Sequence, residues 1–414
     1  MGFHNFGSVR LQNGSFLWQA SVACFVLAGL TGFFYRLGML GWMPGELSFG
    51  NVRHAHSHLM FFAWAVPLPF YIIMQKIVGK LDTHSQVRVI KWMKYSIAAT
   101  LLFGLLAYPF FLFYGYRPVP LGSAAMPLSV VFSGLVMLSW YGFMWGYWKG
   151  RSALKEDDSL PWFDGALFLL SICSLGAWGV AVIQEIAPQS HLLMKSMTHF
   201  FLAAFTEGWV VLILLAVLIS ELNISEKNWP IPPHVALGCI AIGAPLTFPY
   251  GISESLLSST LLITARIGGA LAAIGILIVL LVLYKSGNWK HRIWIWPICL
   301  LSLKGLMQFV SSVIPSSFWL SDPGLRLFYL HILLLGGLTL MGIGWIQVKS
   351  PISIRYYQAV GVAILITLVT LLIPTRLWPD VLSGPWILYA LAFGALLPII
   401  AVTTYWMRLN GSRN

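Results

Sequence analysis

Residues 52–75, VRHAHSHLMFFAWAVPLPFYIIMQ, place three histidines at the start of an apolar run. As a helix rising about 1.5 Å per residue, such a run can cross about 30 Å of hydrocarbon. His54, His56 and His58 therefore lie near one end of a predicted transmembrane helix. Ionisable side chains inside a membrane are costly and are usually kept for a function. The segment thus predicts a membrane fold and a candidate site together.

The composition of the whole chain supports a membrane fold. Hydrophobic residues make up 58% of the 414 residues and charged residues only 9%, whereas soluble domains carry about 25% charged residues. We expect an all-α, polytopic transmembrane helix bundle over residues 1–414. Twelve apolar runs are long enough to span: 16–35, 52–75, 94–115, 122–147, 163–186, 192–220, 232–251, 259–284, 293–314, 325–347, 355–374 and 384–407. The run 232–251 is crowded with prolines, so ten or eleven spans with one re-entrant segment is the alternative.

The net charge of +12 comes from an uneven distribution of basic residues. Seventeen lysines and arginines fall in or beside the loops of one side of this predicted topology, and seven fall on the other side. Loops that stay in the cytoplasm carry such an excess, so both termini are predicted to be cytoplasmic, in the inner (plasma) membrane of the cell. The basicity therefore reports membrane orientation and argues against a nucleic-acid partner.

Three more histidines fall near the outer face in this topology. His191 and His199 lie early in the sixth span, and His331 lies early in the tenth. Imidazoles that several helices present at a similar depth are typical of a site for haem or a transition metal. In the second span, His54 and His58 are one turn apart on the same face, whereas His56 lies about 200° around the helix. One regular helix therefore cannot direct all three at one ion.

Other polar residues in the apolar segments are candidates for supporting roles. Lys304 and Glu207 are predicted near the middle of their spans. The alternatives are a buried structural ion pair, a lysine that extends its ammonium group toward the interface, and part of a proton path. Arg53 and Arg326 are expected near the outer helix ends, where guanidinium groups suit haem propionates; ordinary interfacial anchoring is the alternative. The chain has no C-x-x-C-H motif for covalent haem, so a b-type haem is expected.

Two segments resemble a known family. Ala55-His56, Met60, Phe61, Phe62 and Pro67 are similar in order, and nearly similar in spacing, to the second-helix motif of haem-copper oxidase subunit I. YLHILLLGGLTLMGIGW (329–345), with four glycines behind His331, resembles that family's tenth helix. The NnrS family of haem- and copper-containing membrane proteins looks similar too. The resemblance implies that His56 and His331 are axial haem ligands, with His58 as the reserve for His56. It also implies respiratory electron transfer or the handling of oxygen or nitric oxide, with other respiratory subunits or a cytochrome as electron-transfer partners.

The chain also departs from that pattern. Tyr329 stands where the oxidases keep the high-spin haem ligand, and the His-His pair expected to bind copper is missing. A second metal, copper or another, would need His54, His191 and His199 from different helices. Any enzyme activity would be that of an oxidoreductase. The alternatives are a secondary transporter with twelve spans, or an assembly subunit without a cofactor.

Overall fold

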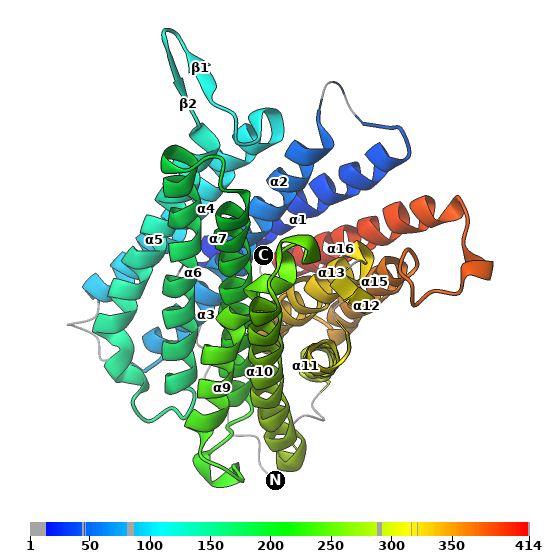
Figure 1. Ribbon diagram of the computed structural model, residues 1–414. Helices are drawn as coiled ribbons and strands as arrows, with labels where there is room; N and C mark the ends of the chain where they lie inside the picture. The colour runs from blue at the N-terminus through cyan, green and yellow to red at the C-terminus, as the bar shows by residue number, and fades with distance from the viewer. Residues whose placement is uncertain are drawn as a thin grey trace. The chain divides into compact units, whose positions relative to one another are not determined.

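A computed structural model describes residues 14–43, 45, 47–80, 87–287, 292–315, 317–320 and 322–412. The chain is almost entirely helical (Figure 1). Within the described residues, eleven helices are long and apolar enough to cross a membrane. The predicted all-α, polytopic transmembrane fold is therefore confirmed.

The predicted seventh span has a different form. Residues 232–251 contain a shorter apolar helix, α9 (Pro233–Leu246), which is followed by a 3₁₀ turn at Phe248–Gly251. Pro245 lies inside α9 and Pro249 lies in the turn. Proline lacks the amide hydrogen that a continuing α-helix needs, which accounts for the short helix.

The chain divides into two compact units. The first unit comprises Met1–Lys155, Gly342–Val360 and Ala395–Asn414, and the second comprises Glu156–Met341 and Gly361–Gly394. The prediction of a single domain stays a prediction. Each unit is described by itself below.

The first unit begins with five helices and one hairpin. They are α1 (Ser15–Met39), α2 (Phe49–Met60), α3 (Pro67–Val78), α4 (Val87–Tyr114), β1 (Val119–Leu121), β2 (Ala124–Met126) and α5 (Leu128–Gly150), with a 3₁₀ turn at Arg151–Leu154. The antiparallel hairpin pairs Val119 with Met126, and it projects beyond the ends of α4 and α5 (Figure 1). Gly122 supplies the positive φ of 67° in its turn.

The second unit contains the helices of the central part of the chain. They are α6 (Leu160–Ile186), α7 (His191–Ala203), α8 (Val211–Glu221), α9, α10 (Ser259–Ser286), α11 (Ile295–Val313), α12 (Ser317–Leu320) and α13 (Pro323–His331), with 3₁₀ turns at Glu226–Asn228, Glu254–Leu256 and Asp380–Leu382. The last three helices, α14 (Thr339–Val348), α15 (Ile354–Leu372) and α16 (Trp386–Gly411), each contribute residues to both units.

The three spans that carry the candidate histidines share an irregularity. A π-helical turn interrupts each of them, at Phe61–Ala65, Ala204–Val210 and Ile332–Leu338. These spans are also the most buried of the candidate spans. In an apolar stretch of 18 residues in each, 78%, 94% and 72% of the residues are buried, against at most 56% in the other spans. In chain order, with α9 counted, they are the second, sixth and tenth. π-Helical turns are rare and frequently mark functional sites.

Glycines allow α9 and α10 to pack with their backbones in contact. A Cβ atom at Gly243 would lie 2.5 Å from the Gly268 carbonyl oxygen and 2.6 Å from the Ala272 nitrogen. Both distances are far below van der Waals contact with backbone atoms, which cannot move aside as a flexible side chain can. Gly238, in the same helix, has no atom within 4 Å of such a Cβ.

We therefore expect Gly243→Val to destabilise the protein and Gly238→Val to have little effect. Overpacking a close contact costs about 1–3 kcal/mol, because α9 and α10 must separate to admit the side chain. Thermal unfolding of both variants in detergent would measure this difference. Equal unfolding temperatures for the two variants would contradict the close packing.

The predicted topology places Lys155 in the cytoplasm and Glu254 outside. Single cysteines at these positions, in a background without other cysteines, should react differently with a membrane-impermeant maleimide. In intact spheroplasts we expect labelling at 254 only, with labelling at 155 after permeabilisation. Labelling of both from one side would mean that residues 232–251 do not cross the membrane.

Candidate functional site

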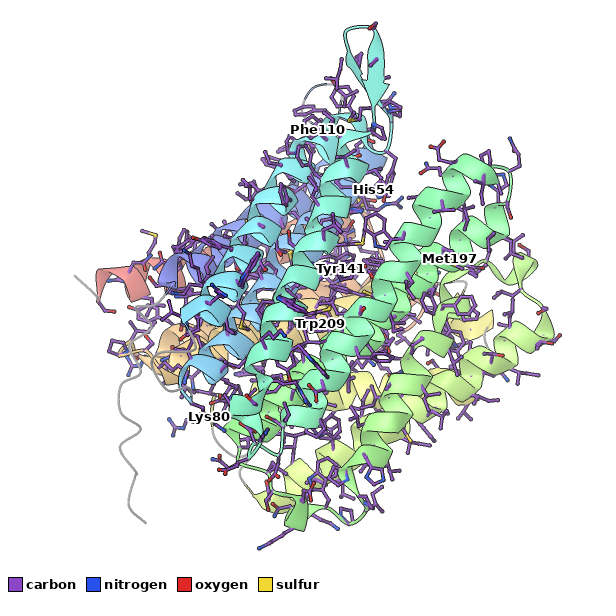
Figure 2. The ribbon with its side chains drawn as sticks, turned by 90° about the vertical axis from the view of Figure 1, so that its left-hand side faces the viewer. His54, Lys80, Phe110, Tyr141, Met197 and Trp209 are labelled. Atoms are coloured by element: carbon purple, nitrogen blue, oxygen red, sulfur yellow. The ribbon has the colours of Figure 1, made fainter. Side chains whose placement is uncertain are left out.

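The three histidines of α2 lie on two faces, as their spacing predicted. The His56 ring packs over Gly32 of α1, and its Nδ1 lies 2.7 Å from the carbonyl oxygen of Ala28. A Cβ atom at Gly32 would lie 2.9 Å from His56 Cε1, so glycine makes room for the ring. His54 and His58 face elsewhere, with their ring centroids 6.1 Å apart. In Figure 2, His54 and Lys80 lie toward opposite ends of the first unit.

His58 belongs to an aromatic cluster at the end of α2 and α4. Its ring stacks on Phe111 with centroids 3.9 Å apart, and the Tyr116 hydroxyl lies 3.3 Å from its Nε2. His54 contacts the Tyr116 ring edge-on at 4.9 Å. Burial among these rings raises the pKa of Tyr116 to about 12, so its hydroxyl stays protonated at neutral pH and can donate to His58.

The hydrogen bonds of the histidines fix their tautomers. In each of His56, His58 and His331, the ring Nδ1 lies within hydrogen-bond distance of a backbone carbonyl oxygen. The carbonyl belongs to Ala28 for His56, to His54 (2.9 Å) for His58 and to Leu327 (2.7 Å) for His331. A carbonyl oxygen only accepts, so each Nδ1 carries a proton and each neutral ring keeps its lone pair on Nε2. Histidines that bind a metal are commonly held in this way, by a carbonyl on the other ring nitrogen.

The remaining predicted ligands lie in the second unit. His331 is half-buried at the end of α13. His199 is half-buried against Gly251, where a Cβ atom would lie 1.9 Å from its Nδ1. His191 is exposed at the first residue of α7. His199 and His191 therefore have different surroundings, and the structure does not show them meeting on one ion.

The predicted second-metal site is not assembled within the described part of the chain. No group of three or more His, Cys, Asp or Glu side chains lies close enough there to hold a metal ion. His54 belongs to the first unit, whereas His191 and His199 belong to the second. The second metal stays a prediction.

The predicted arginines lie beside histidines of their own units. Arg53 is exposed, and His54 and Tyr116 are within range of its charge. Arg326 and Lys195 are the charged neighbours of His199. Each arginine therefore adds positive charge next to an imidazole, where an anionic group would be stabilised.

A buried polar cluster of the second unit surrounds Lys304. Its Nζ contacts a carboxylate oxygen of Glu207 and the side-chain oxygen of Gln308. The Tyr329 hydroxyl donates to the same Glu207 oxygen at 2.8 Å. Lys304 is fully buried, and Gln308 and Glu207 are 3% and 5% exposed. The Lys304–Glu207 contact expected from the sequence is present, and each charge compensates the other away from water.

Two features of this cluster were not predicted from the sequence. From the sequence, Tyr329 was described only as the residue that replaces the high-spin haem ligand of the oxidases. In the structure its hydroxyl donates a hydrogen bond to Glu207. Glu207 lies in the π-helical turn Ala204–Val210, and no local pattern of residues signals such a turn. The distance of more than a hundred residues between Glu207 and Tyr329 also hides their contact from any sequence pattern.

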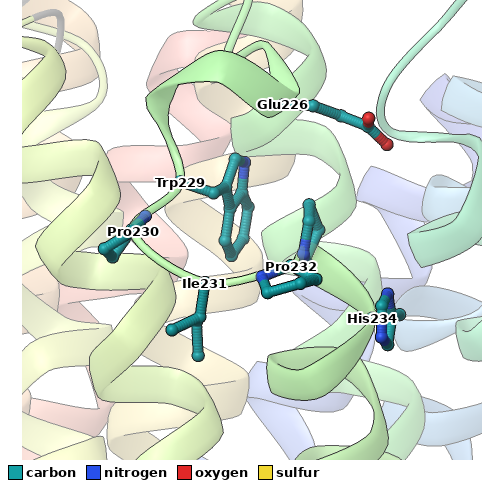
Figure 3. Close-up of a pocket in the computed structure, with 7 residues that line it drawn as sticks. Glu226, Trp229, Pro230, Ile231, Pro232 and His234 are labelled. Atoms are coloured by element: carbon teal, nitrogen blue, oxygen red, sulfur yellow. The ribbon is translucent and has the colours of Figure 1, made fainter.

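A pocket lies in the loop between α8 and α9 (Figure 3). It has a volume of about 480 Å³ and is lined by Glu226, Trp229, Pro230, Ile231, Pro232, Pro233 and His234. Figure 3 shows Trp229 and Ile231 in the loop that connects the two helices, and His234 in the first turn of α9. The pocket is open, and it shares no residue with the Lys304 cluster.

No family model matches the chain, and no curated protein matches it significantly. The residues of the candidate sites are therefore the basis of the proposed function.

Removing one partner of the buried ion pair should strongly destabilise the protein. Lys304→Met leaves the Glu207 carboxylate without a compensating charge, which costs about 3–5 kcal/mol. The double variant Lys304→Met/Glu207→Gln should recover most of this loss. Ser302→Ala, on the same helix, serves as the control because the Ser302 hydroxyl donates to the carbonyl of Ile298 in its own helix. Unfolding temperatures that are equal for the single and double variants would refute the ion pair.

Proposed function

We propose that this multi-pass membrane protein binds a b-type haem, in the inner (plasma) membrane, for respiratory electron transfer or for handling oxygen or nitric oxide. The observation that carries the proposal is the way His56 is held. The Ala28 carbonyl fixes its Nδ1–H at 2.7 Å, which leaves the lone pair on Nε2 for iron. His331, the second proposed ligand, has the same tautomer through the Leu327 carbonyl.

The residues present suit such a cofactor. Low-spin haem is bound by two neutral imidazoles, and both histidines are half-buried on the apolar spans that carry them. Arg53 and Arg326 are the proposed partners of the haem propionates, because a guanidinium group pairs well with a carboxylate. Haem bound there would supply reversible one-electron transfer at its iron. The carbonyl bonds would keep both rings oriented and raise the basicity of Nε2.

The contacts of His58 favour His56 as the ligand from the second span. The lone pair on His58 Nε2 faces the Tyr116 hydroxyl at 3.3 Å, and its ring is stacked on Phe111. Binding iron through Nε2 would require His58 to give up the Tyr116 contact. His56 can bind without losing its hydrogen bond, because that bond uses Nδ1.

A secondary transporter is the second candidate function, and the Lys304 cluster is the observation that favours it. Buried charged residues in membrane helices commonly mark paths for ions or substrates. A transporter would carry out its function without haem, so the cofactor content separates the two candidates.

We expect purified protein, expressed with sufficient haem supply, to show a Soret band and a b-type pyridine haemochrome. His56→Ala and His331→Ala should each abolish the low-spin spectrum, because each removes one axial ligand. His58→Ala should retain it. His234→Ala, at an exposed histidine in the first turn of α9, controls for non-specific binding.

Two results would overturn the proposal. One is wild-type protein without haem by pyridine haemochrome, and the other is an unchanged spectrum in His331→Ala. Loss of the spectrum in His58→Ala, with retention in His56→Ala, would exchange the roles of these two histidines.

A further inference from the structure

A line of three glycines on α5 determines how α5 packs against α4 in the first unit. Gly142, Gly146 and Gly150 are four residues apart, so they lie on one face of the helix. A Cβ atom at these positions would lie close to side-chain atoms of α4: Ser96 Oγ (2.9 Å), Met93 Cγ (2.8 Å) and Val89 Cγ1 (3.1 Å), respectively. The two helices are therefore antiparallel neighbours that touch along this line (Figures 1 and 2).

One side of this helix pair is covered and the other is open. At about 100° per residue, Trp92 lies roughly 70° from the line of contact on α4, and Trp145 lies roughly 100° from it on α5, toward the same side of the pair. These two residues are 52% and 57% exposed. On the opposite side, Phe143 is fully buried and its ring stacks on Phe70 of α3 at 3.7 Å. The side with the tryptophans is therefore open to the surroundings of the protein.

Two basic residues lie on the same open side, about one turn nearer the helix ends. Arg88 comes four residues before Trp92 in α4, and Lys149 comes four residues after Trp145 in α5. Both are exposed, and Lys149 Nζ lies 4.5 Å from the centroid of the Trp145 ring. Because the helices are antiparallel, the two cations share one level, and the two tryptophans lie about 6 Å deeper. We refer to these four residues as the α4–α5 face.

No acidic residue of this part of the chain compensates the two cations. Residues 83–155 contain no Asp or Glu, and no ion pair joins Arg88 or Lys149 to an acidic side chain among the described residues. The predicted topology places these helix ends at the cytoplasmic surface of the membrane. Basic residues between membrane helices at that surface suit anionic lipid headgroups, and tryptophan is enriched at the level of the headgroups.

A transmembrane helix of a partner protein suits this face less well than a lipid does. Membrane helices associate through small residues, but the glycines of α5 already pack against α4. The open side presents large indole rings instead, and Leu138 of α5, 53% exposed, extends the apolar surface toward the middle of the membrane. Charge, aromatic rings and aliphatic surface thus follow one another in the order in which a phospholipid presents its phosphate, glycerol and acyl chains.

We propose that the α4–α5 face binds an anionic phospholipid. The phosphate lies between the Arg88 guanidinium and the Lys149 ammonium group, and the acyl chains lie along Trp92, Trp145 and Leu138. A zwitterionic phospholipid binds more weakly, because its own cationic group is repelled by the same two side chains. The site belongs to the first unit alone and includes none of the histidines proposed to bind haem.

Native mass spectrometry of the full-length protein in detergent would measure this binding. We expect phosphatidylglycerol to bind at least tenfold more tightly than phosphatidylcholine with the same acyl chains. Arg88→Gln/Lys149→Gln should lower the affinity for phosphatidylglycerol at least tenfold and leave that for phosphatidylcholine unchanged, because only the charge of the face is lost. Trp145→Ala should weaken the binding of both lipids, since the indole ring contacts their chains.

Lys91→Gln/Lys155→Gln is the matched control, because it also removes two exposed cations from this end of the first unit. Lys91 lies roughly 170° from the line of contact on α4, and Lys155 follows the 3₁₀ turn beyond α5. This variant should retain the preference for phosphatidylglycerol. Inorganic phosphate should not displace the lipid, because it lacks the acyl chains that contact the tryptophans.

Photo-crosslinking would locate the bound lipid. Phosphatidylglycerol with a diazirine in one acyl chain should label peptides that contain Trp92 or Trp145, and it should label them less in Arg88→Gln/Lys149→Gln. Equal affinity for the two lipids, equal losses in the two double variants, displacement by inorganic phosphate, or labelling confined to other helices would each overturn the proposal. None of these measurements requires haem, so they fail independently of the proposed function.

Discussion

The ion pair between Lys304 and Glu207 sets the strongest constraint on the second unit. A charge in hydrocarbon must be compensated nearby, so α11 and the sixth span must hold these two side chains in contact. Tyr329 and Gln308 complete the arrangement by bonding to the carboxylate and to the ammonium group. The helices α11, α7–α8 and α13 are thereby fixed to one another by polar contacts, in a unit that is otherwise apolar.

The same constraint explains the histidines of α2. An imidazole at the end of a membrane helix needs a partner for its N–H group, and a backbone carbonyl provides one at His56 and at His58. Gly32 admits the His56 ring against α1, and Phe111 covers the ring of His58. The two faces of one helix therefore hold histidines in different environments, one against a neighbouring helix and one among aromatic rings.

Composition and hydropathy predicted the helical membrane fold because both depend on the length and polarity of local segments. Helical spacing also predicted that His56 and His58 face apart, and a Lys304–Glu207 ion pair was one of the alternatives that the chemistry of buried charges offered. The bond from Tyr329 to Glu207 was not predictable, since it depends on how distant spans pack. Residues 232–251 were predicted as a full span, but α9 is shorter. The prolines in this segment had already indicated that alternative. The two proposed haem ligands belong to different units. They remain a prediction, because a shared site would depend on how distant parts of the chain pack.

The three π-helical turns have a consequence for how these spans evolve. A π-helical turn accommodates one extra residue in an α-helix, and each residue of an α-helix turns the chain by about 100°. Without such a turn, an added residue would rotate the rest of the helix by that angle. With it, Val211–Glu221 keeps its facing relative to His191–Ala203, and deleting one residue from Ala204–Val210 would restore a regular α-helix. In each span, the segment with the histidines and the segment beyond the turn can thus each keep their own contacts with neighbouring helices. A change in one half of the helix need not be matched in the other.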